Sequence, residues 1–251
     1  FEEISVDEIY YWIIKTLMNK SSNTMNNNKA KVLIFTAKDS YSRKQHLGKT
    51  ITFDGSHVVK NTSSTPANGT IQNLEFSLQE LQKLLANFPQ NQAIVTGQVL
   101  DSSQYIQSDD VNYLNCTSKG KEHGRSNTIS RTKEYIGYDN SSGFLLVDYD
   151  PEENTKSLTA NELHQKLCSV HSGFTGAGYV AKYSSSAGLI TPDGQPNKKS
   201  NGFHMYYFVE NGASIPAFIE ELYAACWLKG YGYIKVAKNG NKLDRTSLFD
   251  K

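Results

Sequence analysis

Two carboxylates separated by one residue, Asp148 and Asp150, end an apolar run that begins at Phe144. Side chains alternate along a strand, so both carboxylates point to the same face. Like charges placed this way repel unless a cation lies between them, and carboxylate oxygens are ligands that Mg²⁺ and Mn²⁺ prefer. The pair predicts a divalent-metal site at the end of a buried strand. Taken alone, it is also compatible with a solvated strand end before Pro151.

A second polar group opens a later strand, in the segment Ser200-Asn201-Gly202-Phe203-His204. Alternation places Gly202 and His204 on one face. A glycine leaves room for a ligand to approach the backbone, and an imidazole can donate a hydrogen bond to a phosphate oxygen. The segment predicts a phosphate-binding position, although a lone histidine there is also compatible with a structural role.

A third acid would complete a metal site. Leu243-Asp244 follows the last predicted strand, and Phe249-Asp250 offers the same pattern further on. Three carboxylates and a histidine on one sheet face suit nucleotidyl transfer, in which two divalent ions clamp the triphosphate and activate the attacking 3′-hydroxyl. The sequence is compatible with either Asp244 or Asp250 as the third carboxylate, and we favour Asp244.

Capping boxes and apolar periodicity predict the elements that carry these groups. Boxes at residues 5–8, 77–80 and 159–162 predict helices to about residue 20, to Pro89 and to about residue 172, and a fourth helix is expected at residues 214–228. Strands are expected at residues 31–37, 51–59, 93–99, 144–147, 178–184, 203–209 and 233–237, with a connector at 61–69 and a long loop at 101–127. This order is typical of a mixed sheet flanked by helices.

Composition limits the function classes. The 251 residues carry a net charge of +1, so no global basic field indicates a nucleic-acid partner. Three scattered cysteines do not form a disulfide framework, and no apolar run approaches membrane-spanning length, so we expect an intracellular protein without membrane contact. A zinc site made of Cys116, His123, Cys168 and His171 is not expected, because Cys168 falls in the apolar stripe of its helix.

The ordered motifs resemble those of the archaeo-eukaryotic primase superfamily, closest to primase-polymerases of plasmids, phages and other mobile elements. The resemblance rests on four segments between residues 129 and 250: Ile129-Ser130-Arg131-Thr132, Asp148-Tyr149-Asp150, Ser184-Ser185-Ser186-Ala187-Gly188 with Gly202-Phe203-His204, and Leu243-Asp244. It implies one catalytic domain over residues 1–251, with an N-terminal α/β module (1–128) and a recognition-motif-like antiparallel sheet module (129–251). It also implies a fragment of a longer replication protein in the cytoplasm of a prokaryotic host.

The resemblance implies roles for individual residues. Asp148, Asp150 and Asp244, with Asp250 as the alternative, would hold two Mg²⁺ or Mn²⁺ ions beside the catalytic His204. The nucleotide would be bound by His204, Lys182, Ser184, Ser186, Ser200 and Gly202. Single-stranded DNA template would contact Arg131, Lys198, Lys199, Lys119, Lys121 and Arg125. The segment from Leu189 to Lys199 separates the Ser/Gly stretch from Gly202, where relatives are often more compact, so Ser200 is a second candidate for the serine beside His204.

The expected activity is therefore a DNA primase-polymerase that uses NTPs or dNTPs, with a fused or associated helicase as a further candidate partner. Two other functions are weighed against it. One is a non-catalytic nucleic-acid-binding module of a replication protein, which would gain nothing from acids that repel phosphates. The other is a metal-dependent nuclease or replication initiator.

Overall fold

The structure is a computed structural model. It describes residues 28–37, 49–53, 58–62, 68–100, 111–115, 128–129, 133, 135–151, 157–184, 187–189, 194, 201–236 and 243–249. The expected N-terminal helix lies outside these ranges. In the described part, a mixed sheet is flanked by three α-helices, which confirms the expected mixed α/β class. None of the helices in this part is long and apolar enough to cross a lipid bilayer.

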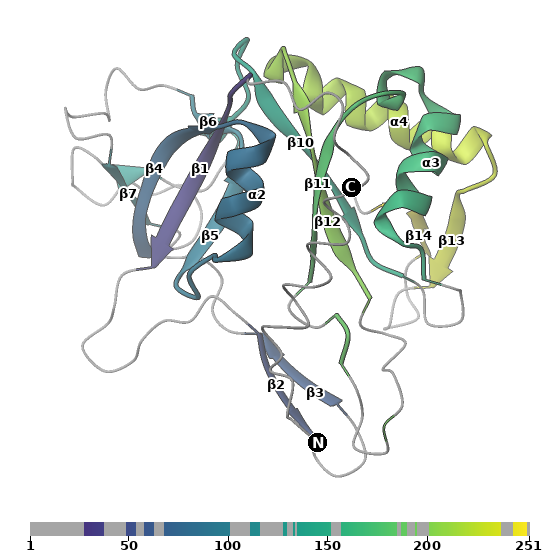
Figure 1. The fold of residues 1–251 in the computed structure, drawn as a ribbon, viewed down its shortest axis with the longest axis horizontal. Coiled ribbons are helices and arrows are strands. Elements are labelled where there is room, and N and C mark those ends of the chain that lie inside the picture. Colours follow the sequence, from purple (N-terminus) through teal and green to yellow (C-terminus); the bar gives the residue numbers. More distant parts are fainter. Residues whose placement is uncertain are drawn as a thin grey trace.

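The main sheet has eight strands, in the order β11-β12-β10-β1-β4-β7-β8 with β5 paired to β1. Their bounds are β1 (Ala30–Ala37), β4 (Asn68–Phe76), β5 (Gln92–Thr96), β7 (Val111–Asn115), β8 (Thr128–Ile129), β10 (Gly143–Tyr149), β11 (Tyr179–Tyr183) and β12 (Phe203–Val209). The pairs β1–β10 and β7–β8 are parallel, and the other pairs are antiparallel. Strand β1 thus joins strands from both halves of the chain into one sheet (Figure 1).

Three two-stranded sheets accompany the main one: β2 (Lys49–Phe53) with β3 (Val58–Thr62), β6 (Gln98–Val99) with β9 (Ile136–Gly137), and β13 (Tyr233–Val236) with β14 (Leu243–Thr246). The single strand expected at residues 51–59 is wrong, because β2 and β3 form a hairpin around the Asp54-Gly55 pair, a common turn signal. The strand expected at 93–99 is divided at Gly97, whose φ of 104° ends the regular β conformation.

Helices α2 (Leu78–Ala86) and α3 (Ala160–Val170) begin at the predicted capping boxes, with reciprocal bonds at Ser77–Glu80 and Thr159–Glu162. Helix α4 (Ile215–Leu228) begins after Ser214, which makes no side-chain cap, and carries a proline in its first turn. Short 3₁₀ turns at Ser172–Phe174 and Gly212–Ser214 precede β11 and α4. The helices were predictable because their start signals are local.

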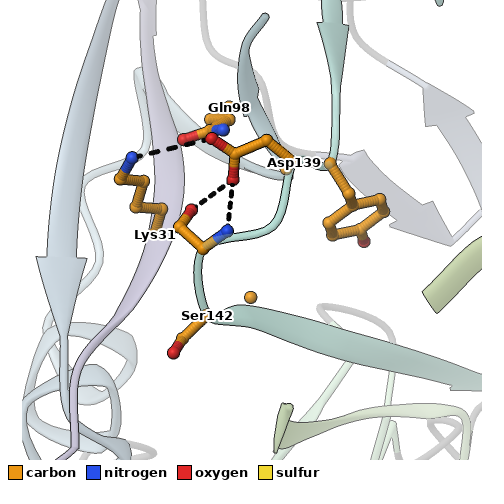
Figure 2. Close-up of a pocket in the computed structure, with 8 residues that line it drawn as sticks. Lys31, Gln98, Asp139 and Ser142 are labelled. Carbon is orange, nitrogen blue, oxygen red and sulfur yellow. Dashed lines mark hydrogen bonds and ion pairs between the residues drawn. The ribbon is translucent and has the colours of Figure 1, made fainter. Parts of the chain in front are cut away.

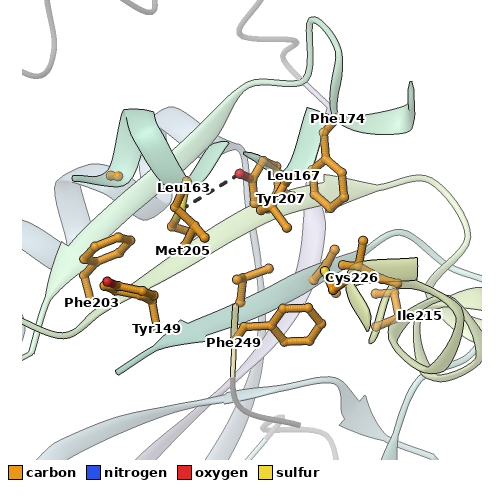
Figure 3. Close-up of a cluster of buried hydrophobic side chains, with 14 residues drawn as sticks. Tyr149, Leu163, Leu167, Phe174, Phe203, Met205, Tyr207, Ile215, Cys226 and Phe249 are labelled. Carbon is orange, nitrogen blue, oxygen red and sulfur yellow. Dashed lines mark hydrogen bonds between the residues drawn. The ribbon is translucent and has the colours of Figure 1, made fainter. Parts of the chain in front are cut away.

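Strands β10, β12 and β11 lie between α2 on one side and α3 and α4 on the other (Figure 1). Along β10, Leu145, Val147 and Tyr149 belong to the buried cluster beneath α3 and α4, whereas Phe144 belongs to the cluster with α2. The larger cluster also takes Phe203, Met205 and Tyr207 from β12, Leu163 and Leu167 from α3, and Phe249 (Figure 3). Burial on both faces explains the unbroken apolar run before Asp148.

Strands β4 and β7 of the main sheet were missed, and so were the short strands β8, β9 and β14. Strand β4 pairs with β1 from Gly69 to Phe76, yet residues 61–69 were expected to be a connector and 70–76 received no assignment. Strand β7 lies inside the loop expected at 101–127 and pairs with β4. Both strands carry many polar residues and lack clear period-two alternation, so their β conformation depends on pairing with strands distant in sequence.

We expect Leu163→Ala to lower the free energy of unfolding by about 2–5 kcal/mol, because Leu163 is fully buried and its truncation leaves a cavity. The matched control is Leu228→Ala at the end of α4, where the side chain is 91% exposed, and its effect should stay within about 0.5 kcal/mol. Urea denaturation followed by circular dichroism measures both. Equal losses in the two variants would contradict the assigned position of α3.

Candidate active site

The candidate site is built on three adjacent strands. Asp148 on β10 lies directly opposite His204 on β12, and His204 lies opposite Lys182 on β11. Directly opposite residues of antiparallel strands share a face, so these three side chains form one row. Imidazole Nε2 of His204 lies 3.2 Å from carboxylate Oδ1 of Asp148, and the two side chains are 40% and 41% exposed.

A second row of site residues lies closer to the strand ends, one ladder position beyond an intervening row made of Tyr149, Phe203 and Tyr183. Tyr149 and Tyr183 both pair with Phe203, and the Ser184 amide donates to the Gly202 carbonyl at 2.9 Å, which extends the ladder by one position. The second row therefore consists of Asp150, Gly202 and Ser184, two positions beyond the first row along the strands. The structure places five predicted site positions beside the acid Asp148 in two neighbouring rows: Asp150, His204, Lys182, Ser184 and Gly202.

Gly202 leaves room for the Asp150 carboxylate. A Cβ atom at this position would lie 2.5 Å from Oδ1 of Asp150 and 3.0 Å from the carbonyl oxygen of Tyr149. Any side chain would therefore displace the Asp150 carboxylate, which lies over the glycine and is exposed. The close approach explains the glycine between two strand residues.

The residues between the site positions are buried on the opposite face. Tyr149 and Phe203 are 6% and 1% exposed, and their rings lie 4.8 Å apart. The Tyr149 hydroxyl accepts a hydrogen bond from the Leu158 amide at 2.9 Å, just before α3 begins. The buried side chains therefore hold the strand ends that carry Asp148, Asp150 and His204.

Tyr206 is a neighbour that the motifs did not include. It is 5% exposed on the α2 side of β12, and burial, followed by the nearby charge of Asp148, raises its pKa to about 12. The hydroxyl therefore stays protonated at neutral pH beside the acid. Strand alternation, which puts Tyr206 on the His204 face, was the signal that could have identified it.

Lys182 contacts the N-terminal half of the chain. Its Nζ donates to the Leu85 carbonyl at 2.9 Å, at the C-terminal end of α2, and lies 5.4 Å from the centre of the Phe88 ring. A cation there also interacts favourably with the helix dipole. Burial lowers the pKa of Lys182 below its ordinary value. Lys182 thus links α2 to the site row, a contact that the sequence did not predict.

The third acid has a different setting from the expected one. Asp244 does not follow the last strand, because it lies within β14, opposite Lys235 of β13. Its side chain and the whole of Asp250 lie outside the described part. Phe249 is 3% exposed in the cluster beneath Tyr149. The chain just before Asp250 is therefore anchored under β10.

The remaining predicted contacts cannot be placed. The positions Ser186, Ser200, Arg131, Lys198, Lys199, Lys119, Lys121 and Arg125 all lie outside the described residues. Within the described ranges, no three or more His, Cys, Asp or Glu residues lie close enough together to hold a metal ion.

Two of the four residues considered for zinc, Cys168 and His171, lie in the described part, and they contact different partners. Cys168 contacts His164, one turn earlier on α3, with 3.6 Å between Sγ and Nε2. His171 instead accepts a hydrogen bond from the Gly173 amide through Nδ1. Cys116 and His123 lie outside the described residues.

A small pocket lies at the other end of β10, about 17 Å along the strand from Asp148 at about 3.3 Å per residue (Figure 2). Asp139 in its wall accepts hydrogen bonds from the amide and hydroxyl of Ser141 and lies 4.0 Å from Nζ of Lys31. Burial alone would raise the Asp139 pKa, but the bonds from Ser141 and Gln98 and the Lys31 charge together lower it. This pocket is a structural junction where β1 meets β10.

Comparisons of the chain with protein-family models, with curated proteins and with solved structures find no match.

Lys182→Met is expected to change how stability depends on pH. Because the folded pKa of Lys182 lies below its ordinary value of about 10.5, the unfolded chain holds this proton over a range in which the folded chain has released it. The free energy of unfolding of the wild type should therefore rise, relative to the variant, as pH increases through that range toward 10.5. Urea titrations of both proteins between about pH 8 and 10.5 measure the difference. A difference that falls or stays flat contradicts the burial of Lys182.

Proposed function

We propose that the chain is a template-dependent nucleotidyltransferase, a DNA primase-polymerase that makes or extends primers on single-stranded DNA. The observation that carries the proposal is the pair of rows at the ends of β10, β11 and β12. They bring two acids, a histidine, a lysine and a serine around one glycine. The Asp148–Asp150 motif and the Gly202–His204 motif are separated by more than fifty residues in the chain, and nothing local required them to meet.

The acids fit a divalent cation. Asp148 is half-exposed and Asp150 is exposed, and both offer hard oxygen ligands. Two positions along one strand separate them by about 6.6 Å of backbone, which leaves room for ions between and beside the carboxylates. When bound, Mg²⁺ or Mn²⁺ would offset phosphate charge and lower the pKa of the attacking 3′-hydroxyl. Asp244 or Asp250 would supply the third carboxylate.

The other residues would act on the nucleotide. His204, whose Nε2 lies beside the Asp148 carboxylate, would donate from its ring to a phosphate oxygen. Gly202 would allow a phosphate to approach the backbone, near the Ser184 hydroxyl. The ammonium of Lys182 would contribute charge from the end of the first row. Template contacts by the basic residues at positions 119–131 and 198–199, and a helicase partner, rest on the sequence pattern.

The test is incorporation of labelled NTPs and dNTPs on single-stranded and primed templates with Mn²⁺ or Mg²⁺. Asp148→Asn and Asp150→Asn should each lower the rate by about 10²–10³, the size of effect seen when an electrostatic stabiliser is removed. His204→Ala should raise the KM for nucleotide more than it lowers metal affinity.

Glu210→Gln is the matched control, because this carboxylate is exposed just beyond the far end of β12. It should leave incorporation unchanged. Circular dichroism checks that each variant is folded. If neither template yields product from the wild type, or if Asp148→Asn matches Glu210→Gln, the proposal fails.

Asp244→Asn and Asp250→Asn form a second test, of the third ligand. We expect incorporation to fall in Asp244→Asn by a factor similar to Asp148→Asn, because a two-ion site needs a third carboxylate. Asp250→Asn should stay near the wild-type rate. The opposite result identifies Asp250, which follows the buried Phe249, as the third ligand. If both variants are as active as the wild type, the three-acid site is contradicted.

The same variants separate the proposal from a second candidate, a non-catalytic nucleic-acid-binding module. Such a module would bind single-stranded DNA without incorporating nucleotides, and its binding should improve in Asp148→Asn and Asp150→Asn because each variant removes a negative charge facing the phosphates. Fluorescence anisotropy with a labelled oligonucleotide distinguishes this outcome.

A further inference from the structure

A second group of reactive side chains lies on the opposite face of β12, beneath α3. It consists of Cys168 and His164, one turn apart on α3, and Tyr207 on β12. Tyr207 belongs to the cluster under α3 and α4, whereas His204 on the same strand faces the candidate site. The proposed nucleotidyl transfer uses none of these three residues.

The three side chains are connected by short contacts. Sγ of Cys168 lies 3.6 Å from Nε2 of His164, and Nδ1 of the same ring lies 3.1 Å from the Tyr207 hydroxyl. That hydroxyl donates in turn to Sδ of Met205 at 3.9 Å. The His164 ring also packs against Tyr179, with 4.8 Å between ring centres. Both ring nitrogens are thus engaged, and the ring orientation is held from two sides.

One tautomer of the imidazole suits a base at this position. In the tautomer that carries its proton on Nδ1, the ring donates to the Tyr207 oxygen and the Tyr207 hydroxyl donates to the Met205 thioether. This tautomer carries a lone pair on Nε2. The Cys168 thiol can then donate to Nε2, which is placed to take its proton.

The surroundings keep the ring neutral and the hydroxyl protonated. Burial lowers the pKa of His164, which favours the neutral base at physiological pH. Burial, with smaller contributions from Tyr179 and Cys168, raises the pKa of Tyr207 far above its ordinary range. The relay of hydrogen bonds therefore does not depend on a charged partner.

The two described cysteines differ in burial. Cys168 is partly exposed at the edge of the cluster, whereas Cys226 on α4 is fully buried. The two thiols therefore offer an internal comparison within one folded chain.

We propose that Cys168 is a modification site that forms a mixed disulfide with low-molecular-weight disulfides such as glutathione disulfide, with His164 as its base. Nε2 takes the thiol proton as the sulfur attacks one sulfur of the small disulfide. A new S–S bond forms to Cys168 and the S–S bond of the reagent breaks. The leaving thiolate takes the proton from His164, so Cys168 is oxidised, the reagent is reduced and the base is regenerated.

The experiment follows glutathione disulfide reacting with the whole chain at pH 7.5, with each cysteine quantified by peptide mass spectrometry. In the folded wild type, Cys168 should react about tenfold or more faster than in the chain unfolded in urea. The expected factor is smaller than the roughly 10²–10⁴ typical of a general base, because an ordinary thiol is already about one tenth ionised at pH 7.5. Cys226 should instead react more slowly when folded. A folded Cys168 that reacts no faster than in the unfolded chain overturns the proposal, and this comparison needs no variant.

His164→Gln tests the base directly. It should slow folded Cys168 about tenfold, whereas His171→Gln, which removes a histidine that contacts Gly173 and Phe218 but not Cys168, should change the rate less than about twofold. In urea, all three proteins should react at the same rate. If Cys168 reacts at the same rate in folded His164→Gln as in the folded wild type, the assignment of His164 as the base is overturned. An equal loss of rate in His164→Gln and His171→Gln overturns it too.

Discussion

The antiparallel pairing of β10 with β12 is the interaction on which the candidate site depends. It runs in register from Gly143 opposite Val209 to Tyr149 opposite Phe203. In this register Asp148 faces His204 across the ladder, and the acid and the imidazole share the face toward α2. A slip of one residue would turn Asp148 into the apolar cluster, where an unpaired carboxylate is costly. The chemistry of the site is therefore a consequence of strand register.

Burial on the far side of the sheet holds that register. Val147, Tyr149, Phe203 and Met205 are each 6% exposed or less, and they pack beneath α3 and α4. The Tyr149 hydroxyl also accepts from the Leu158 amide, which fixes the chain between β10 and α3. The polar ends of the strands are thus supported by an apolar layer that extends nearly to the last residue of β10.

Strand β12 presents different chemistry on its two faces. His204 and Tyr206 face α2, where Lys182 of the neighbouring strand bonds to Leu85 of that helix. Met205 and Tyr207 face α3, where they orient the His164 imidazole beside the Cys168 thiol. The period of two along one strand separates a proposed phosphoryl-transfer site from a proposed thiol site. The two proposals stand on opposite faces and can fail independently.

Local patterns in the sequence predicted what neighbouring residues decide. The capping boxes before α2 and α3, the bounds of β12 and the common face of Gly202 and His204 follow from hydrogen bonds and alternation within a few residues. Strands β4 and β7 did not follow, because their polar sequences become strands only by pairing with distant partners. The bond from Lys182 to Leu85, between residues 97 positions apart, could not be read from either segment. Such contacts depend on how the sheet brings its strands together, so only the tertiary structure places α2 against the row that carries Asp148 and His204.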